Sequence, residues 1–115
     1  MKQTTKFITK RIILHICIIL FMLTGSILNG IAFYSNGNRM PVQTHMLVDD
    51  DTHFSFIDKS EVNNYWLTDI IGLKEWHMIS IGDIMIYSGA VAIIYFGIWT
   101  TIKFRRYKNV ERNIN

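Results

Sequence analysis

Apolar residues are concentrated in two long stretches near opposite ends of the chain, and a largely polar segment separates them. Residues 12–33 and 84–102 contain no Asp, Glu, Lys or Arg. A helix needs roughly 20 apolar residues to cross the hydrocarbon core of a bilayer. The pattern therefore predicts an all-α membrane protein, a two-span transmembrane helical hairpin with spans at residues 12–34 and 79–102.

Charged residues are distributed asymmetrically around these spans. The leader 1–11 and the tail 103–115 are basic, whereas the loop 35–78 is net acidic. Because basic residues favour the cytoplasmic side of a membrane, we expect both termini in the cytoplasm and the loop outside it. The acidic residues of the loop are Asp49, Asp50, Asp51, Asp58, Glu61, Asp69 and Glu75.

Length and composition limit the remaining possibilities. A chain of 115 residues forms one domain at most, and the part outside the two spans is too short for a large water-soluble core. The net charge of +3 is the sum over two basic ends and an acidic loop. We expect the basic ends to lie at a membrane surface, where they favour anionic lipid headgroups. Membrane lipids are therefore expected partners, and nucleic acid is not.

The first span allows a second interpretation. A basic leader, an apolar core and the small residues of Gly30-Ile31-Ala32 are also typical of a cleaved signal peptide. The apolar stretch is longer than the about 7 to 15 residues of such a core, which favours a retained span.

Cys17, the single cysteine, lies in this span and is expected to be a small buried hydrophobe; an intermolecular disulfide or an acylated thiol is the alternative.

Small and polar residues in both spans predict close helix packing. Ser26 and Gly30 form one small-xxx-small pair, Ser88 and Ala92 form another, and small residues let helix backbones approach closely. Gly89 flattens the surface of the second span, and Asn29 in the first would need a hydrogen-bonding partner. These positions are the expected helix-packing residues: Ser26, Asn29, Gly30, Ser88, Gly89 and Ala92.

The loop begins with a turn and is expected to contain a short helix. Asn36-Gly37 favours positive φ, and Pro41 stiffens the chain that follows. Asp58 and Glu61 have the spacing of a capping box, which predicts an amphipathic helix at about 60–77 on the membrane surface. Its apolar stripe would be Val62, Trp66, Ile70, Leu73 and Trp76.

Asp83 is the most informative single residue, because a carboxylate at the entry to a span must be paired, hydrated or close to the interface. The simplest interpretation places it at the helix start, where free amides and the helix dipole stabilise an anion. It could instead contact Asn29, Asn36 or Arg39 across the hairpin, or act as a catalytic or proton-transferring group. Arg39 could meet a lipid phosphate or pair with Asp83 or Asp69.

Other chemistry has little support in the sequence. The loop residues His45, Asp49, Asp50, Asp51 and His53 are possible metal ligands, but their spacing matches no calcium loop, and we expect a solvated acidic segment without a metal or cofactor. Ser26, Ser80 and Ser88 lack an evident base, so no catalytic residue is assigned. A membrane aspartyl protease of the signal-peptidase-II type would need Asp69 or a loop aspartate beside Asp83, and further spans.

Three short motifs resemble a group of bacterial multi-pass membrane proteins of unknown function. Segment 30–42 ends in Asn-Gly-Asn-Arg-Met-Pro-Val, residues 67–71 read Leu-Thr-Asp-Ile-Ile, and residues 80–83 read Ser-Ile-Gly-Asp at the entry to the last span. The resemblance covers residues 24–89. Members of that group usually have further spans before the turn, and Asn38 stands where a second glycine is common.

The resemblance implies an integral protein of the bacterial plasma membrane with a polar cluster at the outer face, formed by Asn36, Arg39, Asp69 and Asp83. It implies no activity. Taken together, we expect a non-catalytic subunit or interaction partner of a larger membrane assembly, which pairs with itself or with a larger membrane protein. The alternative is a membrane-embedded enzyme or transport component that uses Asp83.

Overall fold

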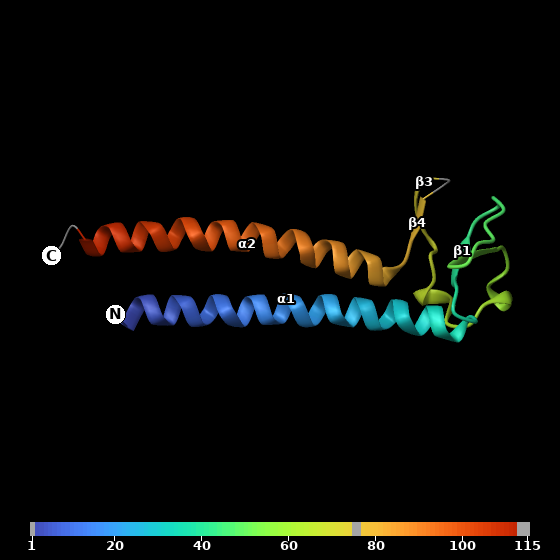
Figure 1. The fold of residues 1–115 in the computed structure, drawn as a ribbon, viewed down its shortest axis with the longest axis horizontal. Coiled ribbons are helices and arrows are strands. Elements are labelled where there is room, and N and C mark those ends of the chain that lie inside the picture. Colours follow the sequence, from blue (N-terminus) through green and yellow to red (C-terminus); the bar gives the residue numbers. More distant parts are fainter. Residues whose placement is uncertain (1, 75–76, 113–115) are drawn as a thin grey trace.

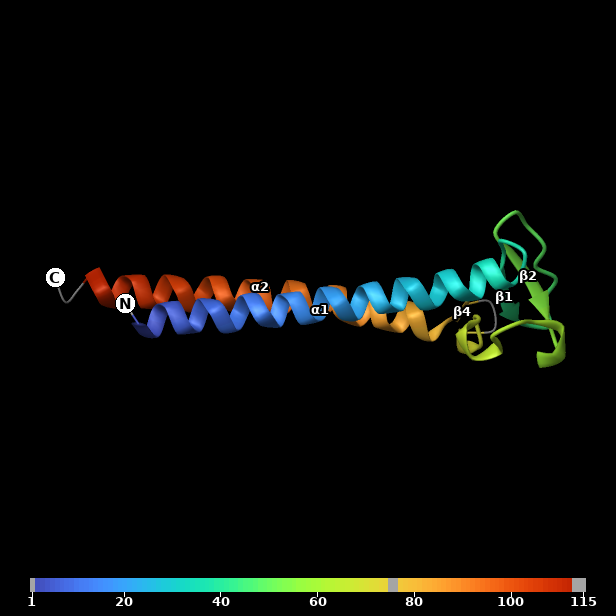
Figure 2. The same cartoon turned by 90° about the horizontal axis from the view of Figure 1, so that it is seen from below.

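The computed structural model describes residues 2–74 and 77–112, and most of them lie in helices α1 (Lys2–Ser35) and α2 (Ile81–Arg112). The helices run side by side in two perpendicular views (Figures 1 and 2). The start of α1 and the end of α2 lie at the same end of a molecule measuring 69 × 24 × 20 Å. Both helices are long and apolar enough to cross a membrane, as the apolar pattern predicts.

The helices are longer than the apolar stretches. The basic leader and tail were expected as separate segments, but α1 already begins at Lys2 and α2 continues to Arg112. Neither flank contains a Pro or Gly that would end a helix. A helix of 34 residues extends to about 50 Å, which is longer than the hydrocarbon core of a bilayer, about 30 Å thick.

The segment between the helices folds into a small structure that we call the head (residues 36–80). Strand β1 (Met40–Gln43) pairs in parallel with β2 (His53–Phe56), with Met40 opposite His53. On its other side β1 forms a parallel bridge between Val42 and Asp69. The head therefore has β1 at its centre, and the buried Phe56 ring packs edge-on against Tyr65 at 6.0 Å.

The predicted amphipathic helix at about 60–77 does not form. This segment contains two 3-10 turns, Lys59–Glu61 and Tyr65–Leu67, followed by the antiparallel strands β3 (Ile71–Lys74) and β4 (His77–Ile79). The fold is therefore mostly helical but not all-α. The capping box of Asp58 and Glu61 is present, yet it caps a single 3-10 turn.

Competing contacts explain why this segment is not helical. Asn64 has a left-handed backbone with φ of 53°, which interrupts any helix at this point. The Asn63 side chain donates to the Ser35 carbonyl at 2.9 Å and so completes the end of α1. Of the expected apolar stripe, Trp66 and Leu73 are 74% and 61% exposed, so the stripe is not one buried face; Trp76 lies outside the described residues.

Glycines bring the two helices together near the head. A Cβ on Gly25 would lie 2.7 Å from the Gly82 carbonyl oxygen, and a Cβ on Gly82 would collide with the Asn29 side chain. Further along, Gly89 faces Met22. Of the expected packing residues, Asn29 and Gly89 therefore lie between the helices.

The two small-xxx-small pairs do not form this interface. Ser26 and Ser88 are exposed. A Cβ on Gly30 would meet only the ring of Tyr34, which lies on the same helix. Near the head, the closest approach of the helices is at Gly25 and Gly82, two glycines outside the predicted pairs.

At the opposite end, aromatic and basic side chains join the helices. The Arg11 guanidinium on α1 lies 3.8 Å from the centre of the Trp99 ring on α2, and Lys103 lies 4.7 Å from the same ring. Phe7 packs against Trp99 at 6.3 Å between ring centres. A cation over an indole ring is favourable, more so away from bulk water, so the hairpin is held at both ends.

Candidate functional site

The start of α2 is fixed by a reciprocal capping arrangement. The Ser80 hydroxyl accepts from the Asp83 backbone N–H at 3.0 Å, and Asp83 Oδ2 accepts from the Ser80 N–H at 3.1 Å. This is the geometry of a capping box, with aspartate as the acidic member. The Ser-Ile-Gly-Asp motif thus folds into a helix start with Asp83 in its first turn.

Asn29 connects this helix start to α1. Its Nδ2 donates to Asp83 Oδ1 at 2.7 Å, and its Oδ1 accepts from the Ser80 hydroxyl at 2.7 Å. Asp83 therefore combines two of the predicted roles, the helix-start acid and the contact across the hairpin. Its partner across the hairpin is Asn29, not Asn36 or Arg39. We call Asn29, Ser80 and Asp83 the junction triad.

Asp69 lies next to the junction triad but has a different environment. Its backbone is held by β1, since its N–H donates to the Pro41 carbonyl at 3.0 Å and its carbonyl accepts from the Gln43 N–H at 2.9 Å. The residue is only 7% exposed, and Oδ1 has no hydrogen-bonding partner within residues 2–74 and 77–112. Burial raises the pKa of the Asp69 carboxyl to about 7, and the nearby Asp83 carboxylate adds to the rise.

A cavity of about 370 Å³ connects these two carboxylates. It lies where α1, the start of α2 and the head meet. Its lining combines polar groups with aromatic and apolar groups. The lining residues are Asn29, Gly30, Phe33, Tyr34, Met40, His53, Asp69 and Asp83.

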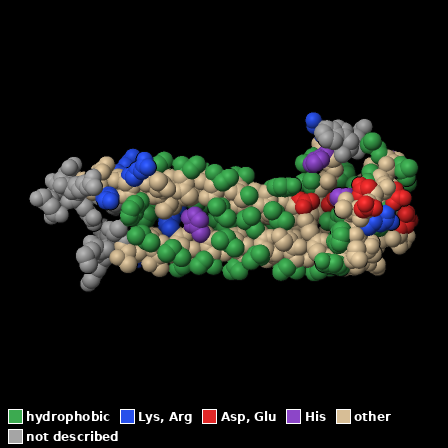
Figure 3. Space-filling view, in the orientation of Figure 1, with side chains coloured by type: hydrophobic (Ala, Val, Ile, Leu, Met, Phe, Trp, Pro, Cys, Tyr) green, Lys and Arg blue, Asp and Glu red, His purple; other side chains and the backbone are tan. Residues whose placement is uncertain are grey.

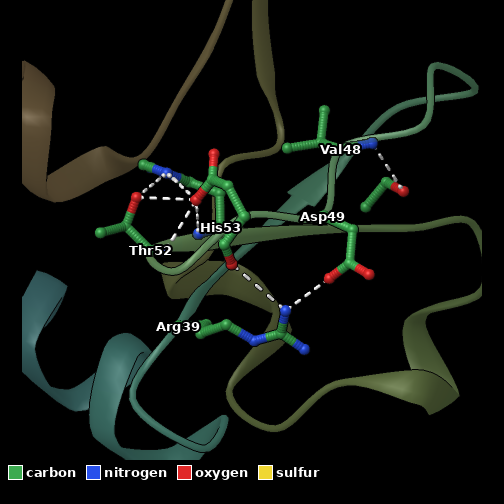
Figure 4. A network of polar contacts seen from close by, with 7 residues as sticks. Arg39, Val48, Asp49, Thr52 and His53 are labelled. Carbon is green, nitrogen blue, oxygen red and sulfur yellow. Dashed lines mark hydrogen bonds and ion pairs between the residues drawn. The ribbon is translucent and has the colours of Figure 1, made fainter.

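Arg39 does not join this site. Its guanidinium donates to Asp49 Oδ1 at 2.5 Å and to the Asp50 carbonyl at 3.3 Å, both within the head (Figure 4). It also lies 5.1 Å from the centre of the Phe54 ring. The expectation that Arg39 pairs with Asp83 or Asp69 is therefore wrong, because the acidic loop supplies a nearer partner.

Asn36 also has a structural position outside the cavity. Its Nδ2 donates to the Ala32 carbonyl at 2.7 Å and to the Asn63 carbonyl at 2.9 Å, and its Oδ1 accepts from the Asn63 N–H at 2.8 Å. These bonds cap the C-terminal end of α1 and attach the Asn63 segment of the head to it. Of the predicted polar cluster, only Asp69 and Asp83 line the same cavity.

The acidic loop uses its carboxylates for local turns. Asp50 Oδ1 accepts from the Thr52 and His53 backbone N–H groups, each at 2.7 Å. Together with the Thr52 hydroxyl, these bonds lower the pKa of Asp50 to about 2. Among the described residues, no group of three or more His, Cys, Asp or Glu side chains is arranged to hold a metal ion.

Several cavity residues were not singled out from the sequence as site residues. Phe33 and Met40 look like ordinary apolar residues, and His53 was noted only as a possible metal ligand. The Ser80 hydroxyl could have been recognised, because Ser followed three residues later by an acid is the spacing of a capping box. No comparable signal marks Phe33, whose position depends on how the head docks.

Comparison with known protein families identifies a match. The family described as a family of unknown function, DUF5317, matches residues 6–95. The matched range includes the junction triad, the whole head and all residues of the cavity. No curated protein and no solved structure matches the chain significantly.

Proposed function

The chain belongs to the DUF5317 family of unknown function, and from its geometry we propose that it is a membrane-spanning hairpin acting as a non-catalytic subunit of a larger membrane assembly. The assembly partner is a second copy or a larger membrane protein. The expected setting is a bacterial plasma membrane, with both termini in the cytoplasm.

The observation that carries this proposal is the exposed apolar surface of both helices. Within the most apolar stretch of each helix, only 6% and 11% of the residues are buried. Continuous apolar surfaces of this size are not stable in water, so lipid or another protein must cover them. The exposed positions on the two helices include Ile12, Ile16, Leu20, Leu23, Ile27, Val91, Ile94 and Ile98.

Charge supports the proposed orientation. Figure 3 shows acidic side chains gathered at the head, and Lys and Arg side chains near the opposite end of the helices. Basic residues next to a span favour the cytoplasm. In the proposed orientation, the cavity and the junction triad would lie at the outer membrane face.

A structural role is supported by the way the polar groups at the junction are used. Asp83 accepts from Asn29 and from the start of α2, so its oxygens hold the hairpin together. Ser26 and Ser88 are exposed. Small residues on such a surface allow close approach by a further helix.

Co-purification tests the assembly proposal. We expect the tagged chain, extracted in mild detergent, to elute as a complex larger than its monomer, and Ser26→Leu to reduce that complex. Thr24→Leu is the control, since it places a leucine on a different side of the same helix. The proposal would be contradicted if the wild-type chain elutes as a monomer both without crosslinking and after crosslinking in membranes.

One observation favours the alternative of an enzyme or transport component. The pKa of Asp69 is raised to about 7, and a group that titrates near the working pH is suited to proton transfer. Asp83→Asn separates the two functions. Normal accumulation and assembly with loss of a transport or enzymatic phenotype would support chemistry, whereas loss of assembly supports the structural role.

A further inference from the structure

We propose that the cavity between α1, α2 and the head is a binding site for a primary ammonium group, held by the carboxylate of Asp69. The rest of the ligand would lie against the aromatic and apolar residues that line the cavity. This inference goes beyond the proposed function, because binding requires the folded chain but no protein partner.

The carboxylate of Asp69 is buried and has no partner among the described residues that balances its charge. The residue is 7% exposed and lines the cavity, and its carboxylate makes no side-chain hydrogen bond in the described part of the chain. Oδ1 is enclosed by the protein, so a ligand in the cavity would contact the carboxylate through Oδ2. Buried polar atoms are nearly always hydrogen-bonded, and a buried carboxylate is favourable only when it is paired. An ammonium group supplies both a charge and N–H donors.

Asp83 cannot take this role in the same way. Its Oδ1 already accepts from Asn29 at 2.7 Å, and its Oδ2 accepts from the Ser80 N–H at 3.1 Å. The negative charge of Asp83 nevertheless contributes to the field in the cavity. The site therefore combines one carboxylate that is free to bind and one that is fixed in place.

The lining favours an organic cation over a metal ion. A divalent hard cation prefers six or more oxygen ligands, or several retained waters, whereas the acidic and imidazole groups on this cavity are Asp69, Asp83 and His53. Phe33 and Tyr34 form an edge-on pair at 5.5 Å between ring centres. Aromatic faces attract cations and accommodate an apolar ligand body.

The size of the cavity limits the ligand. Its volume of about 370 Å³ is at the lower end of the range of about 300–1,000 Å³ for small-molecule sites. A compact amine with an apolar part of benzyl size fits that range. The same ammonium chemistry is available from a soluble amine and from the headgroup of phosphatidylethanolamine.

Calorimetric titration tests the site directly. The full chain in phosphatidylcholine nanodiscs at pH 8 is titrated with phenethylamine, and 2-phenylethanol serves as the uncharged ligand of matched shape. We expect saturable binding of the amine, and affinity for the alcohol that is at least about tenfold lower. Absence of amine binding, or equal binding of the alcohol, would overturn the proposal.

Variants show whether Asp69 is responsible. Asp69→Asn is expected to weaken phenethylamine binding at least about tenfold, while Asp51→Asn, the same change at an exposed position in the head, leaves it unchanged. Circular dichroism establishes that both variants are folded. An Asp69→Asn variant that is folded and binds with wild-type affinity would refute the assignment.

A second measurement decides the matter if Asp69→Asn does not fold. Protonation of Asp69 removes the binding charge, so wild-type affinity should fall about 30-fold from pH 8 to pH 5.5 for a pKa of about 7. The other titratable groups on the cavity are Asp83, His53 and Tyr34. His53→Gln must retain this fall; loss of the pH dependence in that variant would assign the effect to His53 and contradict the role of Asp69.

Lipid composition distinguishes the two sources of the ammonium group. If the headgroup of phosphatidylethanolamine occupies the site, nanodiscs made with this lipid should weaken phenethylamine binding at least about tenfold by competition. Equal affinity in both lipids would assign the site to a soluble amine. Co-purification of a protein partner is unaffected in either case, so failure of the site and failure of the proposed assembly give different results.

Discussion

Two aspartates on one cavity have different environments, and the difference comes from their partners. Asp83 accepts hydrogen bonds from Asn29 and from the backbone of Ser80, whereas Asp69 is held by its backbone and its carboxylate is buried without a partner at Oδ1. A carboxylate that is buried without donors is more stable when protonated. At the scale of single residues, Asp83 therefore stabilises the hairpin and Asp69 reduces its stability at neutral and higher pH.

The pH dependence of unfolding tests this interpretation of Asp69. Its pKa is about 7 in the folded chain and 3.8 when unperturbed, so between these values the folded state binds more protons than the unfolded state. The free energy of unfolding should therefore fall as the pH rises from about 4 to about 7. Asp69→Asn should remove this part of the pH dependence, as followed by unfolding of the detergent-solubilised protein.

The difference between wild type and Asp69→Asn isolates the contribution, because Asp50 and Asp58, whose pKa values are lowered, titrate in both proteins. At pH 8 the variant should be more stable by about 1–3 kcal/mol, because its neutral amide removes the unpaired buried charge of Asp69. Parallel pH profiles for the two proteins would show that Asp69 has an ordinary pKa.

Within the junction triad, substitution of Asn29 should lower the free energy of unfolding most. Asn29→Ala leaves Asp83 Oδ1 without its side-chain donor and the Ser80 hydroxyl without its acceptor. We expect a loss of about 1.5–3 kcal/mol in the free energy of unfolding, since one of the bonds involves a charged group. Asn109→Ala, at an exposed position on α2, is the control and should remain within about 0.5 kcal/mol of wild type.

At the scale of elements, the start of α2 depends on glycines as much as on hydrogen bonds. Gly82 is buried and faces α1, and the Gly25 carbonyl oxygen lies 2.5 Å from the position of a Cβ on Gly82. Such close approach brings Asn29 within reach of both Ser80 and Asp83. The junction triad therefore requires the helices to touch at these glycines.

Alanine substitutions test this requirement with a matched control. Gly82→Ala should force the helices apart and cost about 1–3 kcal/mol, as overpacking of a tight contact usually does. Gly97→Ala has nothing within 4 Å of the added methyl group and should gain up to about 1 kcal/mol from helix propensity. Chemical unfolding of both variants provides the measurement, and equal stability of the two would refute the contact.

The elements also show what the sequence could and could not predict. Long apolar runs predicted both helices, and the Asn-Gly turn appears as predicted, with φ of 72° at Gly37 and 60° at Asn38. The prediction of a helix at about 60–77 was wrong, because the spacing of apolar residues does not show which other segments the backbone will hydrogen-bond to. Asp69 pairs with β1, and Asn63 completes the end of α1.

The candidate site was predictable only in part for the same reason. Asp83 was identified because an acid at the entry to a span is unusual, and Asn29 because an amide inside a span needs a partner. Asp69 was named as a possible partner of Arg39 or Asp83 and from a resemblance, but nothing in its local sequence indicates burial. Arg39 was misassigned because Asp49, which lies ten residues further on, proved to be nearer than either cavity carboxylate.

At the scale of the whole molecule, the arrangement separates charge along its length. Basic residues flank the ends of both helices where the chain begins and ends, and the head is acidic. The apolar surface between these ends is exposed along both helices. The central claim is that this surface spans a membrane, with the head outside and both termini in the cytoplasm.

Cysteine labelling in intact cells tests that claim most directly. In a Cys17→Ser background, Asp51→Cys places a thiol on the head and Asn109→Cys places one near the end of α2, both at exposed positions. A membrane-impermeant maleimide should label the cysteine at position 51 in intact cells and the cysteine at position 109 only after permeabilisation. Equal labelling of both positions from outside, or labelling of position 109 alone, would contradict the hairpin and its orientation.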